Sequence, residues 1–95
     1  MTTGLIYDAR FLDHDTGAGH PEQPARLTAA VSALDAEPWR AQLRDLSPGA
    51  ADLRWIETTH RLDYIHHAEA TCAAGASFLD TPDVAISRGS YEIAC

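Results

Sequence analysis

The stretch "HPEQPARLTAAVSALD" (residues 20–35) decides how the first third of the chain folds. Pro24 suits the first position of a helix, where its missing N–H is not needed. The apolar residues after it recur at the spacing of one helix face: Leu27, Ala30, Val31 and Leu34. Pro38 then ends or kinks the helix. The sequence therefore predicts a long polar loop over residues 9–23 and an amphipathic helix from Pro24.

Two short runs on either side of this helix favour β-strands. "GLIYD" (residues 4–8) is apolar and rich in strand-forming residues, so we expect a buried strand there. In "WRAQLRDLSPG" (residues 39–49) we expect a short helical turn and then a second strand near Leu43–Leu46.

The second half of the chain favours helices. Residues 50–57 predict a short helix, and a longer one is expected from about His60 to Cys72, with Thr58 or Thr59 as its N-cap. Residues 75–89 read as a loop. A last helix is expected at "SYEIAC" (residues 90–95), with its serine as the cap. Because so short a helix has no length to offset the cost of nucleation, we expect the chain to be cut short within a larger domain.

Composition limits the classes of function. The chain has 95 residues and a net charge of −7, and all seven of its basic residues are arginine. An acidic chain without a basic run is not expected to bind the nucleic-acid backbone. No signal peptide is visible, and no stretch approaches the ~18 apolar residues of a membrane span. Cys72 and Cys95 form no disulfide framework. We therefore expect a cytoplasmic protein that does not enter a membrane.

The five histidines raise the question of a metal site. His60 and His67 are seven residues apart, too distant along a helix to share a metal unaided, and the neighbours His66 and His67 point about 100° apart. We expect no metal to bind this chain alone. The glycines of "TGAG" (residues 16–19) lack the pattern of a phosphate loop and favour a flexible surface loop.

Arg26 stands out because it lies in the first turn of the predicted helix, where the helix dipole disfavours a cation. It adjoins the apolar face, so its stem is expected to run inward and its guanidinium to need acceptors. A surface arginine whose stem lies along the helix is an equally good interpretation.

Three segments, in this order and spacing, resemble the N-terminal part of the histone deacetylase superfamily. They are "GLIYDARF…HPEQPARL" (residues 4–27), "ETTHRLDYI" (57–65) and "DVAISRGSYEIA" (83–94). The similarity is closest to bacterial deacetylase-like and acetoin-utilisation proteins and to class II histone deacetylases, and it covers nearly the whole chain. Arg88 departs from the family pattern, which often has proline at this position.

The resemblance implies the N-terminal part of an arginase/deacetylase fold of the α/β class, with a parallel sheet flanked by helices, incomplete in this chain. Family members hydrolyse acetyl-lysine or small acetylated amines with a zinc ion held by Asp, His and Asp, assisted by paired histidines. Those groups lie beyond residue 95 in the family pattern. The resemblance therefore implies no catalytic residue and no metal ligand in this chain.

Some roles at the substrate end do carry over by position. Arg26 matches the arginine that lines the internal channel through which acetate is thought to leave. His20 belongs to the loop around His14–Glu22, which corresponds to the first loop at the rim of the substrate tunnel. Asp80 or Asp83 lies in the second rim loop, where some members hold the substrate backbone with an aspartate, and Asp83 is slightly favoured.

The sequence thus predicts that residues 1–95 are the N-terminal portion of a zinc-dependent deacetylase, inactive alone and completed by a C-terminal remainder. Acetylated amines or acetyl-lysine would be substrates only of the complete enzyme. The alternative is a stand-alone protein-interaction module derived from the same N-terminal elements.

Overall fold

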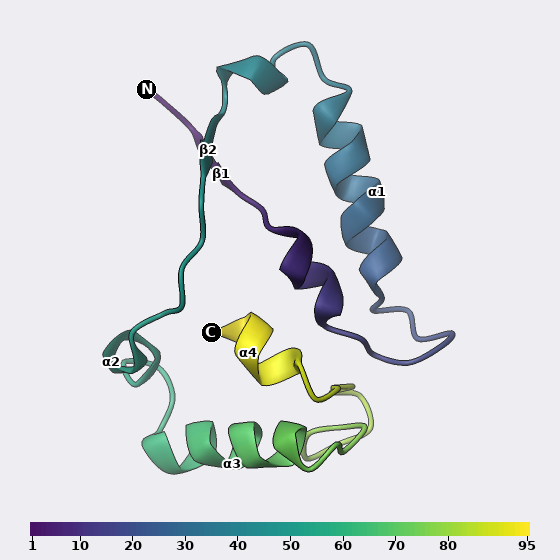
Figure 1. Ribbon diagram of the computed structural model, residues 1–95, viewed down its shortest axis with the longest axis vertical. Coiled ribbons are helices and arrows are strands. Elements are labelled where there is room, and N and C mark those ends of the chain that lie inside the picture. The colour runs from purple at the N-terminus through teal and green to yellow at the C-terminus, as the bar shows by residue number, and fades with distance from the viewer.

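A computed structural model describes residues 1–95 (Figure 1). The chain runs through strand β1, the 3₁₀ helix η1, helix α1, the 3₁₀ helix η2, strand β2 and then helices α2, α3 and α4. In Figure 1 these elements trace an open arrangement, with α1 on one side, α3 along the bottom and the C-terminal α4 between them.

Strands β1 (Gly4–Ile6) and β2 (Arg44–Leu46) pair in parallel and form the whole sheet. Ile6 lies opposite Leu46 in this register. Both strands lie where the sequence predicted them, but the prediction that the first would be buried is wrong. Ile6 remains 57% exposed and Leu46, its partner in the register, 40% exposed. Two strands are too few to distinguish one α/β sheet architecture from another.

The segment after β1 was expected to be loop, but it contains the 3₁₀ helix η1 (Ala9–Asp13). Asp8 caps this helix by accepting the N–H of Arg10 at 2.8 Å. The guanidinium of Arg10 donates to both oxygens of the same carboxylate. These bonds favour the charged form, so they lower the pKa of Asp8 and raise the pKa of Arg10.

Helix α1 (Pro24–Asp35) begins at the predicted proline and ends before Pro38. Three members of the predicted apolar face are half-buried, namely Leu27, Val31 and Leu34, whereas Ala30 is exposed. The 3₁₀ helix η2 (Arg40–Gln42) then leads into β2. Arg40 donates to Asp35 at 2.9 Å and to Asp45 at 2.8 Å, and so joins the end of α1 to β2.

Helices α2 (Leu53–Ile56) and α3 (Leu62–Ala73) match the two helices predicted for the second half. The predicted threonine cap of α3 is wrong. The hydroxyls of Thr58 and Thr59 instead donate to carbonyls in the last turn of α2. They lie in the turn that ends α2, and α3 begins after Arg61, whose side chain makes no capping bond.

The C-terminus of α3 is closed by two kinds of contact. Gly75 adopts a left-handed conformation, with φ +76°, and its N–H donates to the Cys72 carbonyl. The next N–H bonds back to Thr71, which completes a Schellman motif. Arg88 donates to the Ala73 carbonyl at 2.6 Å. Because a cation is favoured at this end of the helix dipole, Arg88 stabilises the C-terminus of α3.

Residues 75–89 are not a featureless loop. Phe78 and Ala85 form an antiparallel bridge, and the connection between them makes a hairpin-like turn. Helix α4 (Ser90–Ala94) follows. The prediction that Ser90 caps it is wrong, because Gly89 is the N-cap residue. The Ser90 hydroxyl turns back and accepts the N–H of Ser87 at 2.8 Å.

The chain buries very little of itself. Only four residues are buried, namely Ile65, Cys72, Ile86 and Ser90. The molecule is flat, with extents of 43 × 35 × 17 Å, and its radius of gyration is 15.6 Å. A compact domain of this length would have a radius of gyration of about 12 Å. Its small core lies where α3 meets α4 and the hairpin.

Candidate functional site

Asp80 is the most tightly held carboxylate among the predicted site residues. It lies in the hairpin after α3 and has a left-handed backbone, with φ 60°. Aspartate tolerates this conformation better than most residues. The Tyr64 hydroxyl donates to its Oδ2 at 3.2 Å, and His67 Nε2 contacts its Oδ1 at 2.7 Å. The carboxylate is therefore fixed against α3 from both of its oxygens.

The two partners of Asp80 lie on one face of α3, three residues apart. Because Oδ1 can only accept, His67 carries a proton on Nε2 and donates it. The hydrogen bond to Asp80 raises the pKa of Tyr64, because it favours the neutral phenol. The ring of His60 also stacks with Tyr64, with ring centroids 6.2 Å apart. About half of the His67 and Asp80 side chains remains open to solvent, at 51% and 49%.

Sequence reasoning missed Tyr64 and His67 as partners of Asp80. Their spacing of three residues within a predicted helix does place them on one face. Nothing in the sequence, however, indicates that the hairpin folds back so that Asp80 reaches that face.

The first predicted rim loop, which begins at His14, is tied to the start of α4. His14 Nδ1 lies 2.7 Å from the hydroxyl of Ser90. The N–H of Asp15 donates to the Ser87 hydroxyl at 3.3 Å. Residues more than 70 positions apart in sequence are thus joined, and the first rim loop lies against the end of the second.

The other predicted site residues do not join Asp80. The N–H of Glu22 donates to His20 Nδ1 at 3.0 Å, so His20 is occupied within its own loop. Arg26 forms an ion pair with Glu22 one helical turn away, and its side chain is 62% exposed. The expectation that its stem runs inward is therefore wrong for this chain, and the surface interpretation holds. Asp83 is exposed in the hairpin, and no hydrogen bond holds its carboxylate.

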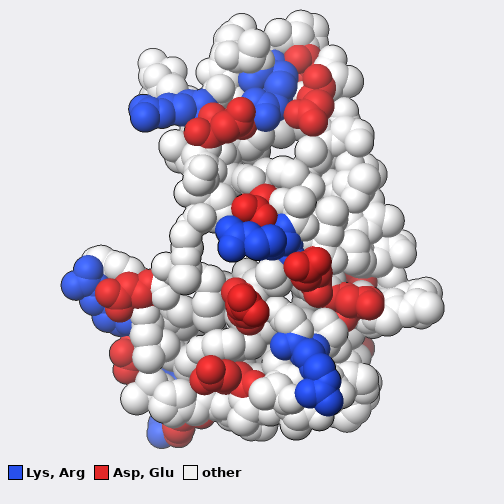
Figure 2. Space-filling model, viewed as in Figure 1, with Lys and Arg blue, Asp and Glu red and all other residues white.

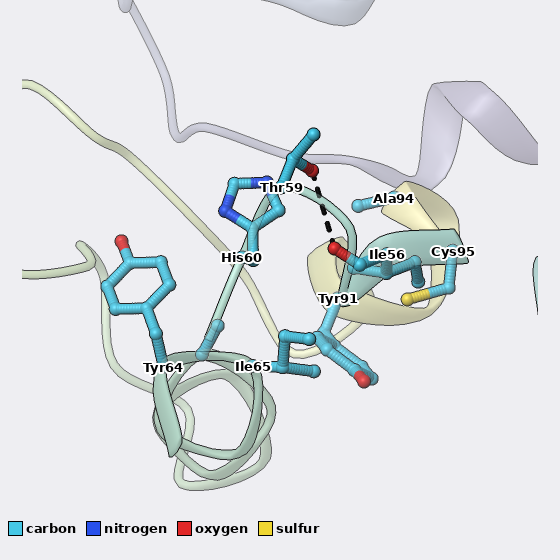
Figure 3. Close-up of a pocket in the computed structure, with 9 residues that line it drawn as sticks. Ile56, Thr59, His60, Tyr64, Ile65, Tyr91, Ala94 and Cys95 are labelled. Atoms are coloured by element: carbon cyan, nitrogen blue, oxygen red, sulfur yellow. Dashed lines mark hydrogen bonds between the residues drawn. The ribbon is translucent and has the colours of Figure 1, made fainter. Parts of the chain in front are cut away.

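A hollow of about 340 Å³ lies between α3 and α4 and shares Tyr64 and His60 with the surroundings of Asp80 (Figure 3). Its walls are mostly apolar and come from Ile56, Thr59, His60, Tyr64, Ile65, Ala68, Tyr91, Ala94 and Cys95. In Figure 3 the Thr59 hydroxyl is engaged by the Ile56 carbonyl, with which it forms a hydrogen bond of 3.3 Å. Burial raises the pKa of Tyr91, and its bond to Cys95 adds to this. The free thiol of Cys95 and the imidazole of His60 both line the hollow, but no hydrogen bond joins them.

Charged side chains of both signs are interspersed on the face seen in Figure 2. Five of the seven arginines form ion pairs with nearby carboxylates, among them Arg10, Arg26 and Arg40. Arg88 instead binds a helix C-terminus. Most of the cations are therefore engaged by neighbouring groups of the same chain.

The residues present do not fit a metal site. No three histidine, cysteine, aspartate or glutamate side chains come close enough together to hold a metal ion. Both cysteines are free, with Cys72 buried and Cys95 half-buried. None of the helices has the combination of length and apolar character that crossing a bilayer requires.

Comparison with known proteins identifies an uncharacterized relative and indicates no activity for the chain. No family model matches the chain. The chain is 36% identical over 93 residues to uncharacterized protein slr0245 of Synechocystis. The match covers 95% of this chain and 30% of that protein. The chain therefore spans about a third of the length of the curated relative that it matches.

Proposed function

We propose that these 95 residues are the N-terminal portion of a larger zinc-dependent deacetylase, and that they supply part of its substrate rim. The proposal rests on the three segments that resemble the histone deacetylase superfamily in order and spacing. The resemblance implies an arginase/deacetylase fold for the complete domain. A location in the cytoplasm belongs to the same proposal and fits the two free cysteines.

The exposed surface supports a larger folding unit. The chain exposes 7008 Å². A compact monomer of 10.3 kDa exposes about 5,400 Å², so the excess is about 1,600 Å². A standard interface removes only about 800 Å² from each partner. The excess is therefore large enough for an extensive, permanent interface, as between two parts of one domain.

The fixed position of the Asp80 carboxylate is the observation that supports a role in substrate binding at the rim. A carboxylate that holds the backbone of a substrate must be oriented before the substrate arrives, and must keep free acceptor capacity. Asp80 meets both conditions, since Tyr64 and His67 fix it while about half of its side chain remains open. Asp83 has no comparable support, so we now assign this role to Asp80.

The proposed roles of His20 and Arg26 rest on the resemblance alone. His20 lies in the first rim loop, close to the substrate tunnel expected for the complete enzyme. Arg26 would face the channel behind the metal, where a guanidinium can bind acetate through two parallel hydrogen bonds. In this chain it pairs with Glu22, so the remainder of the domain would have to cover Arg26 and compete with that pair.

Zinc, held by residues outside this chain, would supply the activated water and stabilise the oxyanion. The residues of this chain would hold and orient the acetylated substrate, which is acetyl-lysine or a small acetylated amine. We therefore expect the chain to show no deacetylase activity alone.

A chimera tests the proposal. This chain replaces the matched region of the Synechocystis protein, and acetate release from an acetyl-lysine peptide and from an acetylated diamine is measured with zinc and with a chelator. We expect chelator-sensitive activity in the chimera and none in the 95-residue chain. Asp80→Asn should raise KM by about tenfold, the effect of losing roughly 1.4 kcal/mol of substrate binding. Asp83→Asn is the matched control and should change KM little.

A folded chimera and a folded Synechocystis protein that both leave these substrates intact would overturn the deacetylase proposal. Exposed apolar surface also suits the alternative, a stand-alone module that binds an unrelated protein. That alternative would be supported if the isolated chain formed a defined complex with such a partner by size-exclusion chromatography.

A further inference from the structure

Three aromatic side chains follow one face of α3. His60 lies just before the helix, and Tyr64 and His67 come four and seven positions later, at the spacing of successive helical turns. The ring centroids of His60 and Tyr64, both labelled in Figure 3, are 6.2 Å apart, and those of Tyr64 and His67 are 6.0 Å apart. These contacts restrict the rings, and the donors of Tyr64 and His67 meet at one carboxylate, that of Asp80.

The tip of the hairpin, residues 79–84, depends on these two donors for its position. The tip lies beyond the antiparallel bridge, and most of its residues are exposed. Its backbone hydrogen bonds join residues of the tip to one another, so they maintain its shape but not its place on α3. Asp80 is the one residue of the tip whose side chain forms hydrogen bonds, and both of them go to α3.

His67 makes the closer of the two contacts with Asp80, at 2.7 Å against 3.2 Å for Tyr64. A hydrogen bond to an ionised acceptor is roughly twice as strong as one between neutral groups. The other charged side chains of this face do not compete for Asp80, because Arg61 and Asp63 pair with each other at 3.0 Å. His67 is therefore the main support of the carboxylate.

We propose that His67 is a positioning residue for substrate binding, which acts by docking the hairpin tip on α3 so that Asp80 keeps one orientation. Tyr64 is its partner in this role. When the tip is undocked, the carboxylate is not oriented for the substrate, and the apparent affinity falls with the fraction of molecules that are docked. The inference rests on the proposed role of Asp80 at the rim, whereas the docking itself requires no activity.

Two substitutions of His67 separate its hydrogen bond from its bulk. His67→Phe keeps a ring and removes the donor, whereas His67→Gln places an amide donor near the position of Nε2. The neighbouring His66 provides the matched control, His66→Phe, because it is exposed, lies about 100° away around the helix and forms no hydrogen bond. All three variants are made in the chimera of this chain with the Synechocystis protein.

The pKa of Tyr64 reports whether the tip is docked. In the chimera, His67→Phe should lower this pKa toward 10, because an undocked Asp80 no longer accepts the hydrogen bond of the phenol. An apolar Phe beside the phenol would by itself raise the pKa, so a decrease is specific to the loss of Asp80. His67→Gln and His66→Phe should leave the pKa raised. The measurement is NMR titration of the tyrosine ring.

Steady-state kinetics of an active chimera test the consequence for the substrate. His67→Phe should raise KM about fivefold and leave kcat unchanged within about twofold, and His67→Gln should keep KM near that of the parent. Asp80→Gly removes the carboxylate and suits the left-handed backbone. In an Asp80→Gly background, His67→Phe should have no further effect on KM, because its partner is already absent.

Three results would overturn the inference. One is a Tyr64 pKa that His67→Phe leaves unchanged, whether or not the chimera is active. Another is an equal decrease of that pKa in His66→Phe. The third is an effect of His67→Phe on KM that is the same with and without the Asp80 carboxylate, as a purely structural role of His67 would give. A folded but inactive chimera in which His67→Phe lowers the pKa would support the docking and count against deacetylation alone.

Discussion

Asp80 shows how much a single residue of this chain depends on its neighbours. Its carboxylate is set by Tyr64 and His67 from α3, and its own backbone conformation is left-handed. Asp83, three residues on, has the same chemistry but no such partners. The sequence favoured Asp83 only slightly, because the difference between the two aspartates lies in which one the hairpin turns toward α3.

The pKa of Tyr64 gives a direct test of this geometry. The bond to Asp80 raises it above its usual value near 10. The bond therefore stabilises the fold fully below pH 10, and this contribution is lost as pH rises through the raised pKa. Asp80→Asn should move the Tyr64 pKa back toward 10, as measured by NMR titration of the tyrosine ring. An equal decrease in Asp83→Asn, the matched control, would contradict the assignment.

At the scale of elements, local signals predicted the helices better than their ends. Pro24 set the start of α1, and the predicted strands and helices were found near their expected positions. The caps assigned to Thr58, Thr59 and Ser90 were wrong because each hydroxyl had a nearer backbone partner in the preceding turn. Capping residues are also common in turns, so residue type alone does not decide which backbone group they bind.

The C-terminus of α3 allows a prediction about one element. Gly75→Ala places a Cβ in the left-handed conformation, 2.6 Å from the guanidinium of Arg88. We expect a loss of about 1–2 kcal/mol in the free energy of unfolding, mainly from backbone strain. The measurement is urea unfolding of the full-length chimera, followed by circular dichroism. Gly49→Ala is the control, because a Cβ there meets nothing within 4 Å and φ is not positive. Equal stability of the two variants would refute the role of Gly75.

At the scale of the whole molecule, the small core and large surface predict weak stability of the isolated chain. Only four of 95 residues are buried, so little apolar area offsets the entropy of ordering the backbone. We expect a broad, weakly cooperative melt by circular dichroism, and aggregation at higher concentration. A sharp, cooperative melt of a monomer, established by sedimentation, would contradict this prediction.

The sequence alone determined the positions of most helices and strands, because proline, glycine and the spacing of apolar residues act over a few neighbouring positions. It also showed the resemblance on which the proposed function rests. Only the tertiary structure decided that Asp80 is held by α3, that Arg26 lies at the surface with Glu22, and that β1 has a free edge. These features depend on contacts between the hairpin and α3, on the packing around α1 and on the number of strands in the sheet. Such features depend on residues that are distant in the sequence, and no local pattern of residues encodes them.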